Sequence, residues 1–233
     1  MKRLLLASTS TVHGRPYLDY LKEEVLDHFT GRDRLFFIPF ARPGGMSHDQ
    51  YAALACGKFA EWGLKMEGLH RQTDLRQALA EADGVFTGGG NTFVLLKELY
   101  DSDLLGMLRQ RVEEGMAYMG SSAGSNLAGM SVGTTNDMPI VHPPSLEALG
   151  AVPFNINPHY LDPDPNSTHM GETRETRIKE FHAFNSQGIL GLREGSWLRV
   201  QGNAVELCGP HTARWFTAGQ EAIELAPGLL KLG

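Results

Sequence analysis

Hydrophobic positions in the first half of the chain follow two alternating spacings. Residues 34–40 form a near-continuous apolar run, which is typical of a strand buried on both faces of a parallel sheet. Residues 16–29 instead carry apolar side chains at the spacing of one helix face. The pattern predicts strands over residues 3–8, 34–40, 64–70, 84–87 and 115–121. It predicts helices over residues 16–29, 47–62, 74–82, 91–100 and 103–114.

The pattern changes after Gly129. Residues 130–164 are rich in Thr, Asn, Pro and Gly and hold only short apolar pieces. A helix is predicted over residues 173–185 and a strand over 188–192, and antiparallel strands are predicted at 197–201, 204–208 and 214–216. Strands spaced by helices predict an α/β fold with a doubly wound, mostly parallel sheet and late antiparallel strands. No linker or repeat interrupts the chain, so we expect one domain over residues 1–233.

Composition narrows the classes of partner. The net charge is -6 and the pI is about 5.8, which argues against a nucleic-acid surface. Two cysteines, Cys56 and Cys208, are too few for a disulfide framework or a thiolate metal site. The apolar run at residues 4–7 is too short for a signal peptide, and no segment is long enough to span a membrane. We therefore expect a cytoplasmic protein without a membrane partner.

The sequence Gly-Ser-Ser-Ala-Gly at residues 120–124 reads as G-x-S-x-G. A strand-like segment precedes it, and residues 125–130 suit a short helix, which is the context that this motif requires. Small residues permit a sharp turn, which would present the Ser122 hydroxyl at the carboxyl end of a strand. The backbone amide of Ala123 would then point to where an oxyanion forms. The alternative is a small-residue turn that only closes a strand–helix unit.

Three consecutive glycines open a second segment, Gly-Gly-Gly-Asn-Thr-Phe, at residues 88–93. It follows a predicted strand and precedes a predicted helix. It lacks the lysine of a P-loop and the spacing of a dinucleotide-binding fingerprint. Bare backbone N–H groups here would complete an oxyanion hole beside Ser122. The alternative is a turn capped by Asn91.

A nucleophilic serine needs a base and an orienting carboxylate. Among the nine histidines, His159 stands out because Pro158 restricts the backbone of the preceding residue and so fixes the direction of the chain at residue 159. His142, in the sequence Val-His-Pro-Pro, is an alternative that could also lie near the site, whereas His211 is expected in a turn between late strands.

Two carboxylates compete for the orienting role. Glu194 comes after a predicted strand, and Asp137 lies in the sequence Thr-Thr-Asn-Asp-Met-Pro. Both could equally be exposed turn residues. A metal site would have to combine His159 with Asp162, Asp164 and His169, but a proline-broken loop gives these residues no shared register. We expect no metal and no other cofactor.

Several segments together resemble the peptidase E family, the α-aspartyl dipeptidases. They occur in family order between about residues 3 and 220. The matching segments are residues 37–41, 88–93, 122–124, 134–141, 156–159, 171–175 and 194–195. The resemblance implies a flavodoxin-like sheet related to class I glutamine amidotransferases, with serine in place of their cysteine. It also implies hydrolysis of dipeptides that begin with aspartate.

The resemblance also implies roles for single residues. Ser122 would be the nucleophile, His159 the base and Glu194 the orienting acid, in a chain order that differs from that of α/β-hydrolases. The amides of Gly90 and Ala123 would form the oxyanion hole. Two positions depart from the family, which usually has tryptophan where this chain has Ser121 and often alanine where it has Ser125.

The expected substrate is therefore a small dipeptide. Asp137 and Asn91 are expected to support the site, and Arg174 or Arg177, one helical turn apart, to bind the substrate carboxylate. Both arginines could instead lie on a solvated helix face and pair with neighbouring glutamates. Two other functions stay open, a small-ester or lactone hydrolase with the same triad and a non-enzymatic carboxylate-binding module. The oligomeric state also stays open, with a homodimer as one option.

Overall fold

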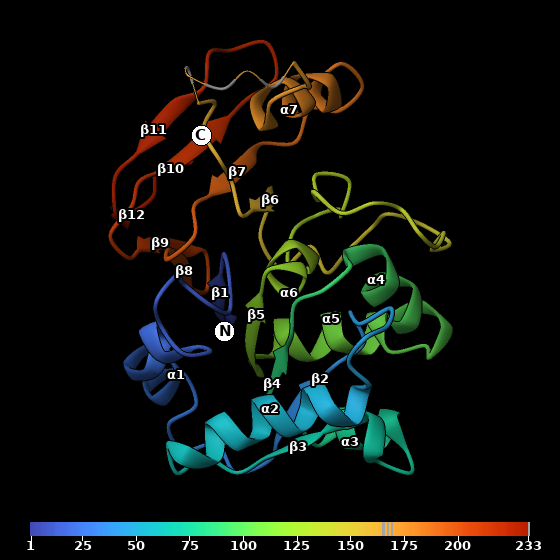
Figure 1. Cartoon of the computed structure of the whole chain (residues 1–233). Helices are drawn as coiled ribbons and strands as arrows, with labels where there is room; N and C mark the ends of the chain where they lie inside the picture. The colour runs from blue at the N-terminus through green and yellow to red at the C-terminus, as the bar shows by residue number, and fades with distance from the viewer. Residues whose placement is uncertain (165, 167, 169, 233) are drawn as a thin grey trace.

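The computed structural model describes residues 1–164, 166, 168 and 170–232. Its elements alternate between strands and helices up to α6 and are mostly strands after it (Figure 1). In chain order they are β1 (Arg3–Ala7), α1 (Lys22–His28), β2 (Leu35–Ile38), α2 (His48–Glu61), β3 (Met66–Gly68), α3 (Leu75–Ala80), β4 (Gly84–Thr87), α4 (Thr92–Asp101), α5 (Leu105–Glu114), β5 (Ala117–Ser121), α6 (Ala123–Leu127), β6 (Asn155–Pro158), α7 (Arg174–His182), β7 (Ile189–Leu192), β8 (Trp197–Gln201), β9 (Ala204–Cys208), β10 (Ala213–Phe216), β11 (Ile223–Leu225) and β12 (Gly228–Leu229).

The strands form two sheets. The larger has the order β12-β9-β8-β1-β5-β4-β2-β3, in which β1 to β5 are parallel and the late strands β8, β9 and β12 are antiparallel. The smaller has the order β11-β10-β7-β6. It lies above the carboxyl ends of β1 and β5 in Figure 1, with α7 beside it. The predicted α/β class with a mostly parallel sheet and late antiparallel strands is confirmed.

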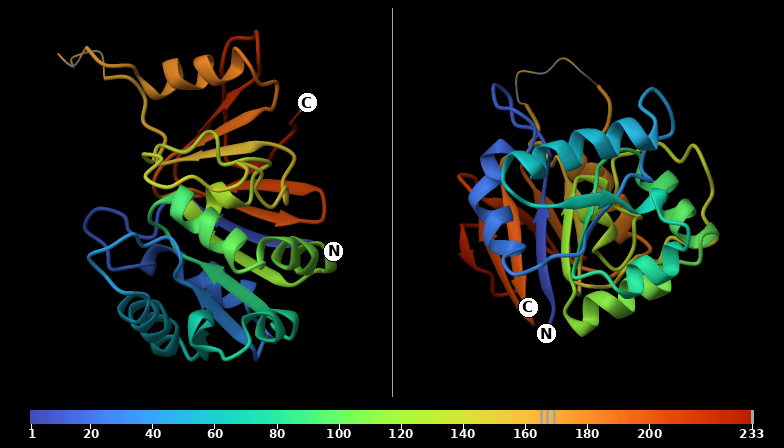
Figure 2. Two further views of the ribbon diagram at one scale, coloured as in Figure 1. Left: turned by 90° about the vertical axis from the view of Figure 1, so that its right-hand side faces the viewer. Right: turned by 90° about the horizontal axis from the view of Figure 1, so that it is seen from below.

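Both faces of the large sheet are covered because its strands alternate between two apolar layers. In β1, Leu4 and Leu6 pack into one cluster, and Leu5 and Ala7 pack into the other. Helices α1 and α2 cover the second layer, whereas α4 and α5 cover the first, as Figure 2 shows from below. The first layer also contains apolar residues of the smaller sheet, so one core continues through both sheets. Ligands of such sheets bind at the carboxyl ends of the strands.

Three details differ from the sequence prediction. The expected helix over residues 16–29 is broken, because Leu18 has a φ of 57° and is followed by a 3-10 turn at Asp19–Leu21. Leu18 is completely buried, so tertiary packing outweighs the helical pattern here. The third strand is shorter than predicted and runs into a second 3-10 turn. Strands β6, β11 and β12 were not predicted, since their short segments carry no clear alternation.

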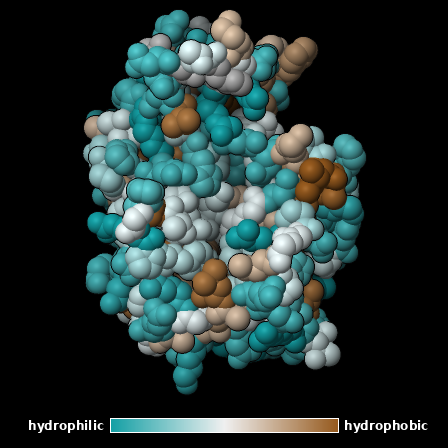
Figure 3. Space-filling view, viewed as in Figure 1, coloured by the Kyte–Doolittle hydropathy of each residue, from teal (hydrophilic) through white to brown (hydrophobic). Residues whose placement is uncertain are grey.

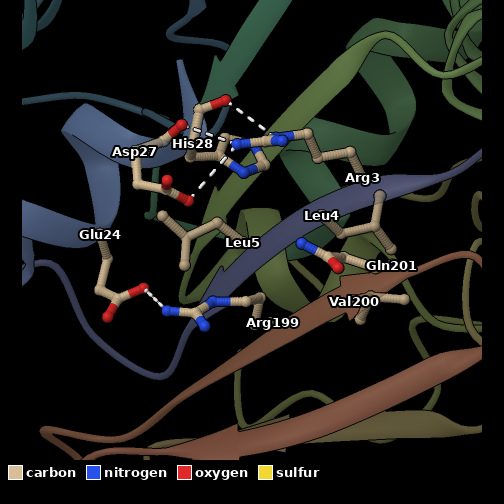
Figure 4. Close-up of a pocket in the computed structure, with 9 residues that line it drawn as sticks. All are labelled: Arg3, Leu4, Leu5, Glu24, Asp27, His28, Arg199, Val200 and Gln201. Carbon is tan, nitrogen blue, oxygen red and sulfur yellow. Dashed lines mark hydrogen bonds and ion pairs between the residues drawn. The ribbon is translucent and has the colours of Figure 1, made fainter. Parts of the chain in front are cut away.

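A buried histidine makes stability depend on pH. Figure 4 shows His28 beside Arg3, in a small recess that Arg199 also lines. His28 is 5% exposed, and no described residue forms a hydrogen bond with its Nε2 atom. Burial, reinforced by the charges of Arg3, Arg32 and Arg199, lowers the pKa of His28 to about 3. The imidazole is therefore neutral in the folded protein at pH values where the unfolded chain binds a proton.

We expect acid to destabilise the fold through His28. Because the folded pKa is depressed, the contribution is complete above about pH 6.5 and is lost as the pH falls toward 3. Between pH 7 and pH 5, this residue alone should lower the free energy of unfolding by about 2 kcal/mol. Urea unfolding at both pH values checks this. His28→Gln should flatten that dependence, whereas a His13→Gln change at an exposed site should leave it intact.

Candidate active site

Ser122 lies in a sharp turn between β5 and α6. Its backbone has φ 53° and ψ −111°, which is strained for a residue with a side chain and costs about 1–3 kcal/mol. The turn is tight because Gly124 passes close to β4, where a Cβ on Gly124 would lie 2.2 Å from the carbonyl oxygen of Thr87. The Ser122 hydroxyl caps no helix N–H. It is therefore available for another partner.

Two predicted residues meet Ser122 from the smaller sheet. His159 follows β6 and Glu194 follows β7, and these two strands are parallel neighbours. The Nε2 atom of His159 lies 2.8 Å from Ser122 Oγ, and its Nδ1 atom lies 2.6 Å from Glu194 Oε1. Such a hydroxyl–imidazole–carboxylate chain can activate a serine for attack on a carbonyl carbon.

The side chains of His159 and Glu194 differ in their exposure to solvent. The Glu194 side chain is 56% exposed and that of His159 is 35% exposed. On the Glu194 side, burial and the nearby Glu194 charge raise the pKa of Tyr20, whose hydroxyl donates a hydrogen bond to the Thr9 carbonyl oxygen.

The middle of the face shown in Figure 3 is recessed and carries mostly residues of near-neutral hydropathy between more hydrophilic margins. A small polar substrate could reach such a surface.

Ser8 fixes the backbone at His159, and the sequence prediction missed it. His159 has a φ of 53°, so it too has a strained backbone that its surroundings must hold. Its N–H donates to Ser8 Oγ at 2.9 Å, and Ser8 Oγ donates to the Leu192 carbonyl oxygen at 2.7 Å. Ser8 is completely buried and directly follows β1. A hydroxyl residue at the carboxyl end of the first strand was the only sequence signal.

Asn136 of the loop after α6 and Asn157 of β6 join that loop to β6. Asn136 Nδ2 donates to the Pro158 carbonyl oxygen at 2.8 Å. Asn157 Nδ2 donates to Asn136 Oδ1 at 2.8 Å and to the Thr134 carbonyl oxygen at 2.7 Å. These bonds join residues 134–136 to the strand that carries His159. The Thr-Thr-Asn-Asp sequence therefore positions the imidazole without touching Ser122.

The glycine-rich turn lies directly beside Ser122. A Cβ on Gly89 would be 3.0 Å from the Ser122 Cβ. Gly90 has a φ of +145° and approaches Ala41 so closely that a Cβ would lie 2.2 Å from its carbonyl oxygen. That oxygen accepts the Asn91 N–H at 2.7 Å. Within the described residues, no acceptor is bonded to the Gly90 amide, which fits a donor for an oxyanion.

Asp137 and Asn91 hold this turn in place. Asp137 Oδ2 accepts hydrogen bonds from the Thr92 N–H at 2.7 Å and from Thr92 Oγ1 at 2.6 Å. Asn91 caps α4 by accepting the Val94 N–H at 3.1 Å, and its Nδ2 donates to the Met138 carbonyl oxygen at 2.9 Å. Both side chains are therefore engaged at the start of α4. Asp137 is not hydrogen-bonded to His159, so its geometry fits support of the turn.

The competing residues do not meet at the nucleophile turn. Ser125 Oγ donates to the Ala7 and Gly120 carbonyl oxygens at 2.6 and 2.9 Å, so it has a structural role. Ser121 is completely buried, and its hydroxyl has no hydrogen-bond partner in the part of the chain that the structure describes. His142 and His211 are exposed, and neither is hydrogen-bonded to Ser122.

The alternative metal ligands are also engaged elsewhere or lie outside the described residues. Asp162 forms two hydrogen bonds of 2.8 Å with Arg193, which also pairs with Glu224. His169 lies outside the described residues. In the part of the chain that the structure describes, no three His, Cys, Asp or Glu side chains are grouped to hold a metal ion. Arg193 instead ties the Glu194 segment to β11, a contact that the sequence did not indicate.

Arg174 and Arg177 lie at the start of α7 and line a cavity of about 380 Å³ with residues 161–164 and 171–173. The alternative pairing with the neighbouring glutamate is not seen, because Glu175 pairs with Lys179 and Arg214. Partial burial and the Arg177 charge lower the pKa of Arg174, and the Asp137 carboxylate opposes this shift. The Arg174 guanidinium therefore interacts electrostatically with Asp137, which binds Thr92 at the end of the glycine-rich segment.

The comparisons with known proteins agree with one another. The profile of Peptidase family S51 matches residues 4–208. Peptidase E of Streptomyces coelicolor is 52% identical over 225 residues, covering 97% of this chain and 91% of that protein. A probable alpha-aspartyl dipeptidase of Drosophila melanogaster is 48% identical over 229 residues, covering 97% and 94%.

Solved structures share the fold at low identity. A putative peptidase E protein of Listeria monocytogenes has a TM-score of 0.66 at 21% identity, covering 90% of this chain and 99% of that one. A peptidase from an acI-B1 actinobacterium has a TM-score of 0.68 at 16% identity, covering 97% of both chains. No helix in the described ranges is long and apolar enough to cross a membrane. From its profile match and its relatives, the chain belongs to peptidase family S51.

Proposed function

We propose that the protein is a serine dipeptidase that hydrolyses dipeptides with an N-terminal aspartate. One observation carries this proposal: Ser122 Oγ lies 2.8 Å from His159 Nε2, and His159 Nδ1 lies 2.6 Å from Glu194. Family membership supports the reaction class, and the names of the relatives from Streptomyces coelicolor and Drosophila melanogaster support the substrate class.

The reaction then proceeds through these three side chains. Ser122 Oγ attacks the carbonyl carbon of the aspartyl residue while His159 Nε2 takes the hydroxyl proton. The amides of Gly90 and Ala123 bind the negative oxygen of the tetrahedral intermediate. The C–N bond breaks as His159 gives the proton to the leaving amine. Water, deprotonated by His159, then hydrolyses the acyl-enzyme and releases aspartate.

Glu194 holds the imidazole tautomer and stabilises the imidazolium. It is half-exposed, so we expect Glu194→Gln to lower kcat by about 10²- to 10³-fold, less than the loss typical of a buried triad acid. Asp137→Asn should cost about tenfold or less, because asparagine retains an acceptor for Thr92. Steady-state kinetics of the two variants, with their unfolding midpoints as controls, checks this order. A larger loss in Asp137→Asn would move the orienting role to Asp137.

Specificity for aspartate requires a cation, and Arg174 is the proposed one. It is half-buried, has no ion-pair partner within the described residues and lies close enough to Asp137 to feel its charge. A buried guanidinium without a carboxylate partner favours an anionic ligand. Replacing the substrate carboxylate by an amide would leave that guanidinium unpaired.

A dipeptide comparison tests the proposed function. We expect kcat/KM for Asp-Leu to exceed that for Asn-Leu by about 10⁴-fold, and N-acetyl-Asp-Leu to resist cleavage. Arg174→Met should lower Asp-Leu cleavage most and narrow this gap. If Asp-Leu, Asn-Leu and Leu-Leu were cleaved at similar rates, the aspartyl specificity would be wrong. If a neutral p-nitrophenyl ester were cleaved and no dipeptide were, an esterase function would replace the proposal.

A serine-directed phosphonylating reagent separates enzyme from binding module. An enzyme should incorporate one equivalent of the reagent at Ser122, because the hydroxyl is activated by His159. Peptide mapping of the labelled protein identifies the site. Absence of labelling at Ser122 in the folded protein would favour a carboxylate-binding module. A homodimer remains a proposal that analytical ultracentrifugation would test.

A further inference from the structure

Two half-buried arginines have neither a hydrogen-bond acceptor nor a carboxylate partner within the described residues. Most arginines of the chain donate a hydrogen bond or form an ion pair, and the exceptions within the described residues are Arg15, Arg42, Arg174 and Arg177. Arg15 and Arg177 are exposed, so water satisfies them. Arg42 and Arg174 are half-buried. Partial removal of a guanidinium from water costs free energy that an anionic ligand would recover.

The position of Arg42 is fixed by a buried aromatic ring. Its guanidinium carbon lies 4.3 Å from the centre of the Tyr51 ring, and Tyr51 is completely buried in α2. The Nε atom of Arg42 is buried and has no hydrogen-bond partner among the described residues. The guanidinium is thus held over the Tyr51 ring, and no hydrogen bond to a described residue competes with a ligand for it.

Contacts along the chain connect Arg42 to the nucleophile. Arg42 follows Ala41, whose carbonyl oxygen accepts the Asn91 N–H at 2.7 Å and abuts Gly90. Gly89, one residue earlier, contacts the Ser122 side chain. The Tyr51 hydroxyl, on the same flank, lies 2.5 Å from where a Cβ on Gly88 would be. The backbone of residues 41 and 89–91 therefore connects Arg42 to Ser122, and the Arg42 side chain contacts α2.

Arg174 approaches the same turn from another element. It belongs to α7, and its pKa responds to Asp137, which binds Thr92 at the start of α4. The α2 and α4 helices cover opposite faces of the large sheet. Arg42 contacts α2, and the charge of Arg174 on α7 is coupled to Asp137, which binds the start of α4.

The surroundings of Arg42 offer space and no competing acid. A surface cavity of about 410 Å³ is lined by Arg42 and by residues 43–48 and 50, none of which is a carboxylate. Asp49, the nearest acid in sequence, is hydrogen-bonded to His70 and Arg71. An anion at Arg42 would therefore have to come from a ligand.

The proposed substrate carries two carboxylates, which matches two unpaired cations. An aspartyl dipeptide has one carboxylate on its first side chain and a second at its C-terminus. We propose that Arg42 binds the C-terminal carboxylate of the dipeptide and so restricts cleavage to dipeptides. This inference rests on the proposed function, in which Arg174 binds the aspartate side chain. In a longer peptide or a C-terminal amide, the carboxylate would be displaced or absent, and Arg42 would stay unpaired.

A comparison of Asp-Leu with Asp-Leu-amide tests this role in the intact protein. The wild type should prefer the free acid by about 10- to 150-fold in kcat/KM, the range for a hydrogen bond to a charged group. Arg42→Met, which keeps an apolar stem against Tyr51, should lose that preference by slowing Asp-Leu and leaving Asp-Leu-amide within about twofold. Arg42→Lys should restore part of the preference, because it restores the charge.

Two further variants serve as matched controls. Arg15→Met removes an exposed arginine that has no partner within the described residues. It should leave kcat/KM unchanged for both Asp-Leu and Asp-Leu-amide. Arg174→Met should slow Asp-Leu and Asp-Leu-amide equally, because both retain the aspartate side chain. Unfolding midpoints of all variants separate loss of binding from loss of folding.

The outcomes distinguish this inference from the proposed function. Equal cleavage of the acid and the amide by the wild type would overturn the role of Arg42, whatever the variants do. An equal loss of kcat/KM for the acid and the amide in Arg42→Met would also overturn this role. The same holds if Arg42→Met loses discrimination between Asp-Leu and Asn-Leu but still prefers the free acid. Failure of the wild type to cleave Asp-Leu at all would instead overturn the proposed function.

Discussion

Replacing Ser122 by alanine should lower kcat/KM for Asp-Leu by about 10⁴- to 10⁶-fold. In the proposed mechanism this hydroxyl attacks the substrate carbonyl, and no other serine at the turn is placed to replace it. Ser125 is bonded to two backbone carbonyl oxygens, and Ser121 is completely buried. Single-turnover and steady-state assays with Asp-Leu measure the loss.

The fold should survive the Ser122→Ala change. The substitution keeps a Cβ at the same strained φ of 53° and removes only one partly exposed hydroxyl. The unfolding midpoint should therefore stay close to that of the wild type. Ser121→Ala is the matched control, since it removes the neighbouring hydroxyl, which has no partner, and should leave the rate near normal. Near-normal turnover in Ser122→Ala, with the phosphonylating reagent on Ser121 or Ser125, would contradict the assignment.

Replacing His159 by alanine should lower turnover to a similar level. In the proposed mechanism the imidazole takes the serine proton and gives it to the leaving amine, so neither step should proceed efficiently without it. The double variant with Ser122→Ala should be hardly slower than either single variant, because the two residues act as one unit. Independent, multiplicative losses in kcat would show that they do not.

His142→Ala is the control for the base. His142 is exposed and has no hydrogen bond to Ser122, so its loss should be mild. The backbone amide of residue 159 still donates to Ser8 in the His159→Ala variant, which favours retention of the local fold. Circular dichroism and thermal unfolding of both variants check this. Abolished turnover in His142→Ala, with His159→Ala still active, would reverse the assignment of the base.

Local pattern determined much of the first half of the fold. The apolar run at residues 34–40 and the small residues at 120–124 predicted a buried strand and the strand–turn–helix around Ser122, and both are observed. The reason is that these signals depend on near neighbours in the chain. Residues 16–29 are the exception, because Leu18 is buried in the core with a left-handed backbone that interrupts the predicted helix.

The choice of partners for Ser122 did not emerge from pattern. His142, His159 and His211 all lay in loops, and Asp137 competed with Glu194. The resemblance to peptidase E selected His159 and Glu194, since it compares whole segments in order. Pattern alone could not, because 37 residues separate Ser122 from His159 and 35 separate His159 from Glu194.

Only the tertiary structure decided what holds the site together. The smaller sheet brings the ends of β6 and β7 over β5, and the buried Ser8 joins His159 to Leu192. Asp137 binds Thr92 at the start of α4, which is a contact between residues far apart in the chain. Hydrogen bonds of this kind depend on where separate elements pack, so no local spacing encodes them. The sequence determined which residues were available for chemistry, and long-range packing determined which of them meet.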